Sequence, residues 1–252
     1  MKAAAFDLVR PGTLAEAATL LMQPGTGALA GGQSLGPMLN LRLARPATLV
    51  PITHLAALSE VSESASTVTI GACVTHAMIS DGMVPDIGLN ILARVAEGIA
   101  YRAVRTRGTI GGSLCHADPA ADWVTVLTAL GAEVLTNRDR VVSLRAFILG
   151  AFRTGLQPGE LVRAVRIPKL SPGARWGYVK ACRKPGEFAH SMAAVLVDSA
   201  TIRAVIGAAG GAPIVLEGDA VTHAPTLPGM DTIDAHMQRV VLGRAMAAAG
   251  LA

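Results

Sequence analysis

Two glycine-rich stretches carry the residue types in this sequence that are best suited to chemistry. They are Ala30-Gly31-Gly32-Gln33-Ser34-Leu35 and Thr109-Ile110-Gly111-Gly112-Ser113, hereafter the first and second glycine motifs. Glycine lets the backbone adopt positive φ and lets another molecule approach its N–H group closely. A run of such N–H groups forms an anion-binding concavity that suits a phosphate or pyrophosphate. One such motif commonly makes only a turn, but two that are far apart predict one long ligand held from two sides.

The first glycine motif also matches the nucleophile elbow of serine hydrolases. Gly32-Gln33-Ser34-Leu35-Gly36 fits the pattern G-x-S-x-G, and His223 and His236 follow it in the order that such a fold needs. However, the oxyanion loop of these enzymes comes from an earlier strand, and too few residues precede Ser34 for that strand and its helix. A serine hydrolase is therefore the weakest alternative that stays open.

A metal site is not expected. Cys73 and His76 have C-x-x-H spacing, and Cys115-His116 would have to supply the remaining ligands. Adjacent cysteine and histidine have poor chelating geometry, and single buried cysteines commonly behave as small hydrophobic residues.

Composition excludes several classes of protein. Hydrophobic residues make up 51% of the 252 residues and charged residues 16%, so the chain can bury one large core or two modest ones and is not disordered. The net charge is +4, but the basic residues are scattered, so nucleic-acid binding is not expected. No apolar run reaches membrane-spanning length. Three isolated cysteines indicate a reducing, cytoplasmic setting and exclude a four-cysteine iron–sulfur cluster in this chain.

The elements that position the motifs can be predicted from periodicity and turn signals. Thr13 and Glu16 form a capping box for a helix to Met22, and strands at 27–30 and 47–52 flank the first glycine motif in a partly parallel α/β unit. The remaining predicted elements are a strand at 68–72, a helix capped by Thr75, a helix at 85–100, a helix to Leu130 with Asp118 as N-cap and Pro119 at N1, a hairpin at 132–136 and 141–144, a strand at 160–167, three strands at 176–184, 192–197 and 201–207, and a helix at 233–249.

Taken together, three stretches resemble a known family. The first glycine motif, the run from Thr109 to Leu114, and His116-Ala117-Asp118-Pro119-Ala120-Ala121-Asp122 are similar to the medium, FAD-binding subunit of molybdenum hydroxylases of the carbon monoxide dehydrogenase and xanthine dehydrogenase type. The resemblance runs from Phe6 to about Gly211. The three stretches in this order are far more specific than either glycine motif alone.

The resemblance implies a fold and an organisation. We expect an α+β fold with a two-part FAD-binding region of the vanillyl-alcohol-oxidase type at 1–172, its subdomains at about 1–56 and 57–172. A small α/β C-terminal domain is expected at 173–252, after the Ser171-Pro172-Gly173 boundary. The family pattern further implies a dimer of heterotrimers. In it a large subunit holds molybdopterin-Mo, a small subunit holds two [2Fe–2S] clusters, and this chain's FAD passes electrons to an external acceptor (oxygen, a quinone or NAD).

The resemblance also implies cofactor-binding residues, whereas this oxidoreductase subunit would have no catalytic residue and no metal ligand of its own. The implied residues are Ala28, Leu29, Ala30, Gly31, Gly32, Gln33, Ser34, Leu35, Thr109, Ile110, Gly111, Gly112, Ser113, Asp122, Val162 and Lys180. The stretch 28–35 would cradle the diphosphate, and 109–113 would close over it. Asp122 would contact the cofactor, and Val162 and Lys180 would lie near the flavin ring, where a lysine can stabilise the negative charge of reduced flavin.

Two other readings stay open beside this one. The first is an autonomous FAD-dependent oxidase or dehydrogenase with its own substrate pocket, and the second is a scaffold subunit whose cofactor site has lapsed. The sequence also departs from the family pattern. Tyr101-Arg102-Ala103-Val104-Arg105-Thr106-Arg107 stands where many relatives have D-P-Q-V-R-N-R, and Ile99 stands where xanthine-type enzymes have an aromatic residue, so no stacking is expected there.

Overall fold

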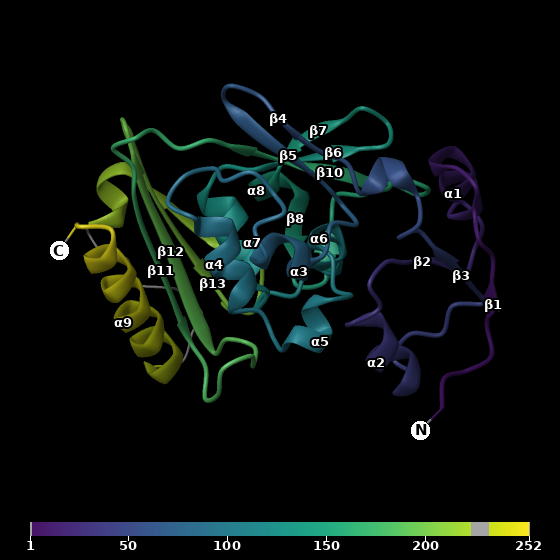
Figure 1. The fold of residues 1–252 in the computed structure, drawn as a ribbon. Coiled ribbons are helices and arrows are strands. Elements are labelled where there is room, and N and C mark those ends of the chain that lie inside the picture. Colours follow the sequence, from purple (N-terminus) through teal and green to yellow (C-terminus); the bar gives the residue numbers. More distant parts are fainter. Residues whose placement is uncertain (1, 223–231, 252) are drawn as a thin grey trace.

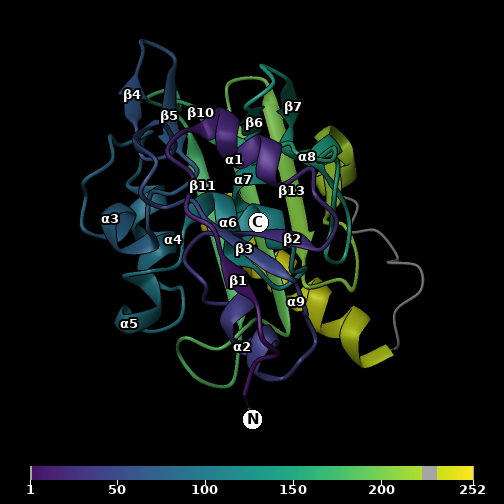
Figure 2. The same cartoon turned by 90° about the vertical axis from the view of Figure 1, so that its right-hand side faces the viewer.

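The N-terminal part of the chain is a small parallel α/β unit. The computed structural model describes residues 2–222 and 232–251. In this unit three parallel strands lie in the order β1-β3-β2, with helix α1 above and helix α2 below them in Figure 2. The elements are β1 (Asp7–Leu8), α1 (Leu14–Leu20), β2 (Thr26–Leu29), α2 (Leu35–Asn40) and β3 (Thr48–Pro51). The predicted parallel pair and the Thr13 cap are confirmed, because Thr13 Oγ1 accepts the Glu16 N–H at 3.1 Å.

The middle of the chain is built on a five-stranded antiparallel sheet in the order β4-β5-β10-β6-β7. Its strands are β4 (Val61–Glu63), β5 (Thr67–Gly71), β6 (Glu133–Thr136), β7 (Val141–Ser143) and β10 (Val162–Pro168). The smaller elements around it are η1 (Ala56–Leu58), α3 (His76–Ser80), α4 (Ile91–Glu97), α5 (Arg102–Arg105), α6 (Ile110–His116), α7 (Asp122–Ala129), α8 (Leu144–Phe147), β8 (Ile148–Gly150) and β9 (Arg153–Thr154). The main hydrophobic core lies between this sheet and the helices.

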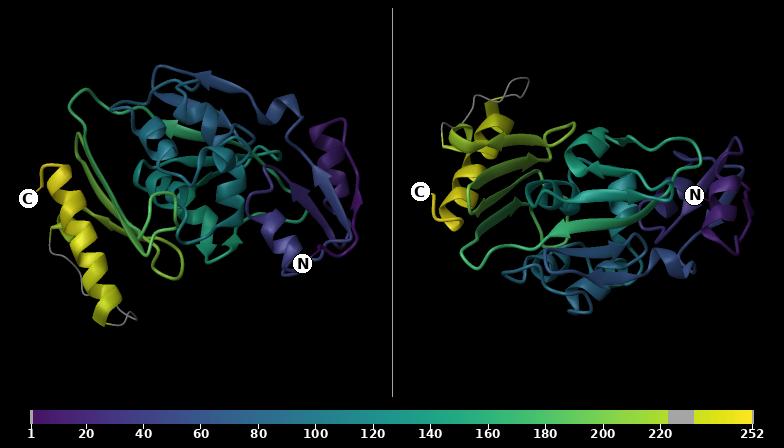
Figure 3. Two further views of the ribbon diagram at one scale, coloured as in Figure 1. Left: turned by 60° about the horizontal axis from the view of Figure 1, so that its bottom comes forward. Right: turned by 90° about the horizontal axis from the view of Figure 1, so that it is seen from above.

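The C-terminal part is a four-stranded antiparallel sheet in the order β11-β12-β13-β14. Its elements are β11 (Arg175–Ala181), β12 (Ser191–Asp198), β13 (Thr201–Gly207), β14 (Ile214–Glu217), η2 (Gly218–Val221) and α9 (Thr232–Ala248). Helix α7 packs on one face of this sheet and α9 on the other, so residues 191–197 of β12 are all buried (Figures 1 and 3). Strand β14 had no counterpart in the sequence prediction.

A buried aromatic pair, His76 and Trp123, joins helix α3 to helix α7. Trp123 is fully buried, and its Nε1–H donates to Nδ1 of His76 at 3.1 Å. His76 is 6% exposed. Burial, with a smaller contribution from the charge of Arg105, lowers the pKa of His76 to about 4. His76 is therefore neutral in the folded protein at neutral pH.

Two helix predictions differ from the structure, and one helix was not predicted. The unpredicted helix is α6, whose first turns are the second glycine motif; Thr109 caps it, with its Oγ1 accepting the Gly112 N–H at 3.1 Å. Asp118 caps only a turn, through the Ala120 N–H, and α7 begins at Asp122 instead. The predicted helix at 85–100 is shortened to Ile91–Glu97, because the preceding residues Leu89 and Asn90 adopt left-handed φ angles of 60° and 54°.

Helix α9 packs closely against β11 at Gly177, and this contact gives a first prediction. A Cβ on Gly177 would overlap the carbonyl oxygen of Ala245 in α9, whereas a Cβ on Gly173 would meet open space. We expect Gly177→Ala to lower the free energy of unfolding by about 2 kcal/mol, since backbone atoms must move apart to fit the methyl group. Gly173→Ala is the matched control, and urea unfolding measures both. Equal stability of the two variants would contradict this packing.

The low pKa of His76 predicts acid sensitivity. Unfolded histidine titrates near 6.5 and folded His76 near 4, so its contribution to stability is complete above pH 6.5 and is lost as the pH falls towards 4. Between pH 7 and pH 5 the free energy of unfolding should fall by about 2 kcal/mol from this residue alone. The measurement is denaturant unfolding at each pH, with His76→Gln as reference. If the variant shows the same decrease, His76 is not responsible.

Candidate functional site

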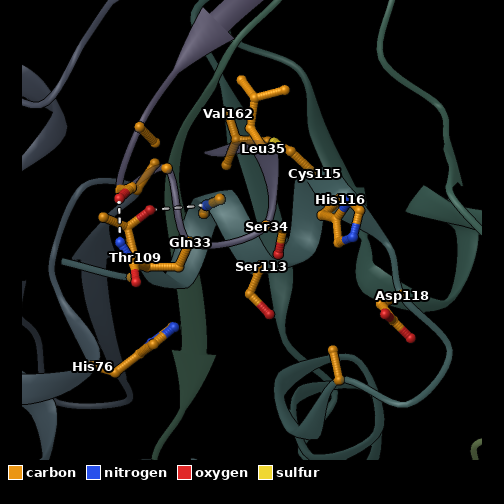
Figure 4. A pocket seen from close by; sticks show the side chains of 18 of the residues that line it. Gln33, Ser34, Leu35, His76, Thr109, Ser113, Cys115, His116, Asp118 and Val162 are labelled. Atoms are coloured by element: carbon orange, nitrogen blue, oxygen red, sulfur yellow. Dashed lines mark hydrogen bonds between the residues drawn. The ribbon is translucent and has the colours of Figure 1, made fainter. Parts of the chain in front are cut away.

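The two glycine motifs line one cavity of about 650 Å³ between the N-terminal unit and α6. Figure 4 shows Gln33, Ser34 and Leu35 facing the α6 side chains across this space. The predicted residues that line it are Ala28, Ala30, Gly31, Gly32, Gln33, Ser34, Leu35, Thr109, Gly111, Gly112, Ser113, Asp122, Val162 and Lys180. Leu29 and Ile110 do not line it. The side chain of Leu29 packs beside Gly32, and Ile110 is fully buried in the main core.

The two segments meet backbone to backbone at Gly31. A Cβ on Gly31 would overlap the carbonyl oxygen of Arg107 and lie 2.9 Å from Cα of Gly108, so only glycine fits. Gly111 has a different neighbour, because a Cβ there would lie 2.5 Å from Cβ of Ala72. Glycine at position 111 therefore lets α6 pack against the end of β5.

The backbone N–H groups of the two motifs are used differently. In the second motif the N–H groups of 110–113 already donate within the protein: Ile110 to the Val74 carbonyl, Gly111 to the Ala72 carbonyl, Gly112 to Thr109 Oγ1 and Ser113 to the Thr109 carbonyl. In the first motif no N–H group from 31 to 35 donates to an acceptor in the described part of the chain. Gly32 supports this open turn with a φ of 71°. The free donors therefore come from the first motif, and the second supplies a close-fitting wall.

A buried ion pair forms the polar end of the cavity. Asp122 is 6% exposed and accepts hydrogen bonds from Lys180 Nζ at 2.9 and 3.1 Å and from the Tyr178 hydroxyl at 2.8 Å. Lys180 Nζ also donates to the Gly98 carbonyl at 3.3 Å. Burial and the Asp122 charge raise the pKa of Tyr178 well above 10, so its hydroxyl remains a donor. Sequence reasoning missed Tyr178, although its i, i+2 spacing from Lys180 on β11 places both on one face of the sheet.

Where β10 begins, Leu161 and Val162 add an apolar wall to the cavity beside the buried carboxylate of Glu160. Leu161 packs against the N-terminal unit, and Val162 lies beside Leu35 and Cys115 (Figure 4). Burial raises the pKa of the Cys73 thiol to about 12, so it is protonated at neutral pH. Val162 and Lys180 both line the cavity, and their place near a flavin ring stays a prediction. Cys115, His76 and His116 also line it, and sequence reasoning did not assign them to it.

The geometry does not support the hydrolase or metal alternatives among the described residues. Ser34 precedes α2, whereas His236 belongs to α9, at the other end of the molecule (Figure 1); His223 lies outside the described residues. Within 2–222 and 232–251, no three histidine, cysteine or acidic side chains gather as a metal site would require. In the same residues, no helix has the length and hydropathy to cross a membrane.

Comparison with known proteins identifies the family. Residues 4–170 match the family described as "FAD binding domain in molybdopterin dehydrogenase". The chain is 36% identical over 205 residues to the caffeine dehydrogenase subunit beta of Pseudomonas sp. (strain CBB1), covering 79% of this chain and 70% of the relative. It is 36% identical over 197 residues to the carbon monoxide dehydrogenase medium chain of Hydrogenophaga pseudoflava, covering 76% and 69%.

Solved structures extend the similarity to the whole fold. A chain of carbon monoxide dehydrogenase from Hydrogenophaga pseudoflava superposes with a TM-score of 0.89 at 29% identity, covering 99% of both chains. A chain of quinoline 2-oxidoreductase from Pseudomonas putida 86 gives 0.89 at 30% identity, covering 100% and 99%. The resemblance inferred from the sequence is thereby confirmed, as are the mixed α and β fold and the oxidoreductase class. The chain belongs to the family of FAD-binding domains of molybdopterin dehydrogenases.

Proposed function

We propose that this chain binds FAD in the cavity between the two glycine motifs and serves as the electron-transfer flavoprotein subunit of a molybdenum hydroxylase complex. In this role its FAD receives electrons from [2Fe–2S] clusters of a partner subunit and passes them to an external acceptor. The observation that supports the proposal most strongly is the run of free backbone N–H groups at 31–35. These residues line one side of the cavity, and the second motif lines another. Bound FAD supplies the redox chemistry, and the protein binds and orients it.

The charges in the cavity support a position for each part of the cofactor. Lys180 is the only lysine or arginine that lines it in the described part of the chain, and Asp122 already pairs with it. The diphosphate is therefore held by the N–H dipoles of 31–35 and not by a free cation. The flavin ring lies at the polar end, near Asp122 and Lys180. The adenosine half lies towards the N-terminal unit, where Leu161 and Val162 add an apolar wall.

The domain organisation belongs to the same proposal. A two-part FAD-binding region of the vanillyl-alcohol-oxidase type, at 1–172 with subdomains at about 1–56 and 57–172, accounts for a cavity between the N-terminal unit and α6. The remaining residues, 173–252, form the C-terminal domain, which reaches the cavity through Lys180.

Partner subunits are proposed from the names of the relatives. Those proteins are named a medium chain, a subunit beta and a "dehydrogenase complex subunit alpha", so each is one component of an assembly. For this chain we propose a large subunit with molybdopterin-Mo and a small subunit with two [2Fe–2S] clusters, in a cytoplasmic dimer of heterotrimers. Oxygen, a quinone and NAD are the candidate acceptors.

Purification from the native host tests this function. We expect a yellow protein that releases FAD, together with copurifying chains that carry molybdopterin and iron–sulfur clusters, as identified by mass spectrometry. The isolated chain should reduce dyes only through its flavin. Turnover of a small organic molecule by the isolated chain would instead indicate an autonomous oxidase, and a chain that stays colourless with added FAD would indicate a lapsed site.

The contact at Gly31 predicts which glycine matters for FAD retention. Gly31→Ala should reduce FAD occupancy at least tenfold, because the new methyl group overlaps the Arg107 carbonyl and separates the two motifs. Gly36→Ala is the matched control, since a Cβ there meets nothing within 4 Å. The measurement is the flavin-to-protein absorbance ratio after gel filtration, with circular dichroism to verify folding. Full occupancy in Gly31→Ala would show that the diphosphate lies elsewhere.

The ion pair predicts opposite shifts of the flavin midpoint potential. Reduced flavin carries negative charge, so a nearby positive charge favours reduction and a negative one opposes it. Asp122→Asn leaves Lys180 unneutralised and should raise the potential, whereas Lys180→Met leaves the Asp122 carboxylate and should lower it. The double variant removes both charges and should return close to the wild-type value. Spectroelectrochemical titration measures all four proteins, and shifts of the same sign would contradict the proposed position of the ring.

A further inference from the structure

The imidazole of His76 lines the cavity, and its hydrogen bond to Trp123 determines which of its two ring nitrogens carries the proton. A tryptophan indole can only donate, and Trp123 Nε1–H donates to Nδ1 of His76. Nδ1 is then the acceptor nitrogen, so the proton of the neutral ring is on Nε2. His76 lines the cavity, and Figure 4 shows its ring pointing into the space that Thr109 and Ser113 border.

The position of Nε2 places this donor beside the junction of the two glycine motifs. A Cβ added to Gly108 would lie 3.0 Å from His76 Nε2, and Gly108 is the residue that Gly31 approaches. The backbone holds this arrangement, because the His76 N–H donates to the Gly108 carbonyl at 2.9 Å and residues 75 and 109 form a β-bridge. In the part of the chain that the structure describes, Nε2 makes no hydrogen bond to a protein acceptor.

We propose that His76 is a cofactor-binding residue whose Nε2–H donates to an oxygen acceptor in the flavin mononucleotide half of FAD. This rests on the proposed FAD site. The flavin half is favoured because the partner of His76, Trp123, adjoins Asp122 at the polar end of the cavity. Among the described residues the His76 Nε2–H group has no hydrogen-bond partner, and an acceptor oxygen of the cofactor would supply one.

A neutral donor suits the charges around it. Arg105 lies close enough to disfavour a second positive charge on His76, and burial acts in the same direction, giving the pKa of about 4. The ring therefore adds a hydrogen bond at neutral pH without adding charge to the cavity. His76 stands outside the glycine motifs and the Asp122–Lys180 pair, so sequence motifs did not indicate it.

Two substitutions separate this role from a structural one. His76→Phe removes both ring nitrogens, and His76→Gln keeps an N–H donor near the position of Nε2. Both leave the Trp123 N–H without its acceptor, so their difference isolates the Nε2 donor. In the full-length chain freed of flavin, we expect His76→Phe to weaken binding of FAD and of FMN alike, by about tenfold, and AMP binding to stay within twofold of wild type. His76→Gln should recover most of the lost affinity.

The outcomes distinguish this inference from the proposed function. Wild-type protein that binds no FAD contradicts the proposed FAD site itself. Wild-type protein that binds FAD, with His76→Phe equally tight, overturns only the role of His76. An equal loss for AMP and FMN also overturns it, because general collapse of the cavity would then be the cause.

A measurement on wild-type protein avoids any folding defect of the variants. In protein labelled with ¹⁵N-histidine, the nitrogen shifts of His76 report which ring nitrogen carries the proton. We expect protonated Nε2, with its proton signal shifting on addition of FMN and not of AMP. Protonation on Nδ1, or an Nε2–H signal that FMN leaves unchanged, would refute the proposal.

Discussion

The cavity depends on one steric constraint, the contact between the backbone of Gly31 and the backbone at Arg107 and Gly108. No side chain fits between these segments. The contact holds the turn of the first motif against the segment that leads into α6, and a small hydrophobic cluster that includes Val50, Ile52 and Leu161 joins the N-terminal unit to the middle of the chain. Residues 31–35, whose N–H groups are free among the described residues, line the cavity beside this contact. The same contact brings His76 next to the junction.

The two glycine motifs look alike in sequence but differ physically. In the first, φ of 71° at Gly32 opens a turn whose donors stay free. In the second, the glycines lie in the first turn of a helix, where Ala72 and Thr109 pack so closely that a larger side chain would not fit. The first motif therefore offers free backbone donors, and the second offers a closely packed surface. A long dinucleotide suits such a site, because its diphosphate needs hydrogen-bond donors on one side and a surface of matching shape on the other.

The C-terminal sheet contributes to the cavity through a network that is neutral overall. Lys180 and Asp122 compensate each other, and Tyr178 donates to the same carboxylate. Packing of α7 against β12 and β13 brings these residues together, and α9 covers the outer face of the sheet. The polar part of the cavity is thus linked to the packing of α7 on a separate sheet.

The sequence by itself determined the family, the glycine motifs, the Thr13 and Thr75 caps and most strands, because these depend on local residue types and spacing. Of the sixteen residues that the resemblance implied as cofactor-binding, fourteen line the cavity, and their contacts with FAD stay a prediction. Tertiary structure decided the rest. Thr109 starts a helix because its side chain caps Gly112 while the β-bridge to Thr75 holds its backbone. Tyr178 and His76 acquire their partners from α7, about fifty residues away in the chain. Such pairings form only when distant segments pack together, and no local pattern records them.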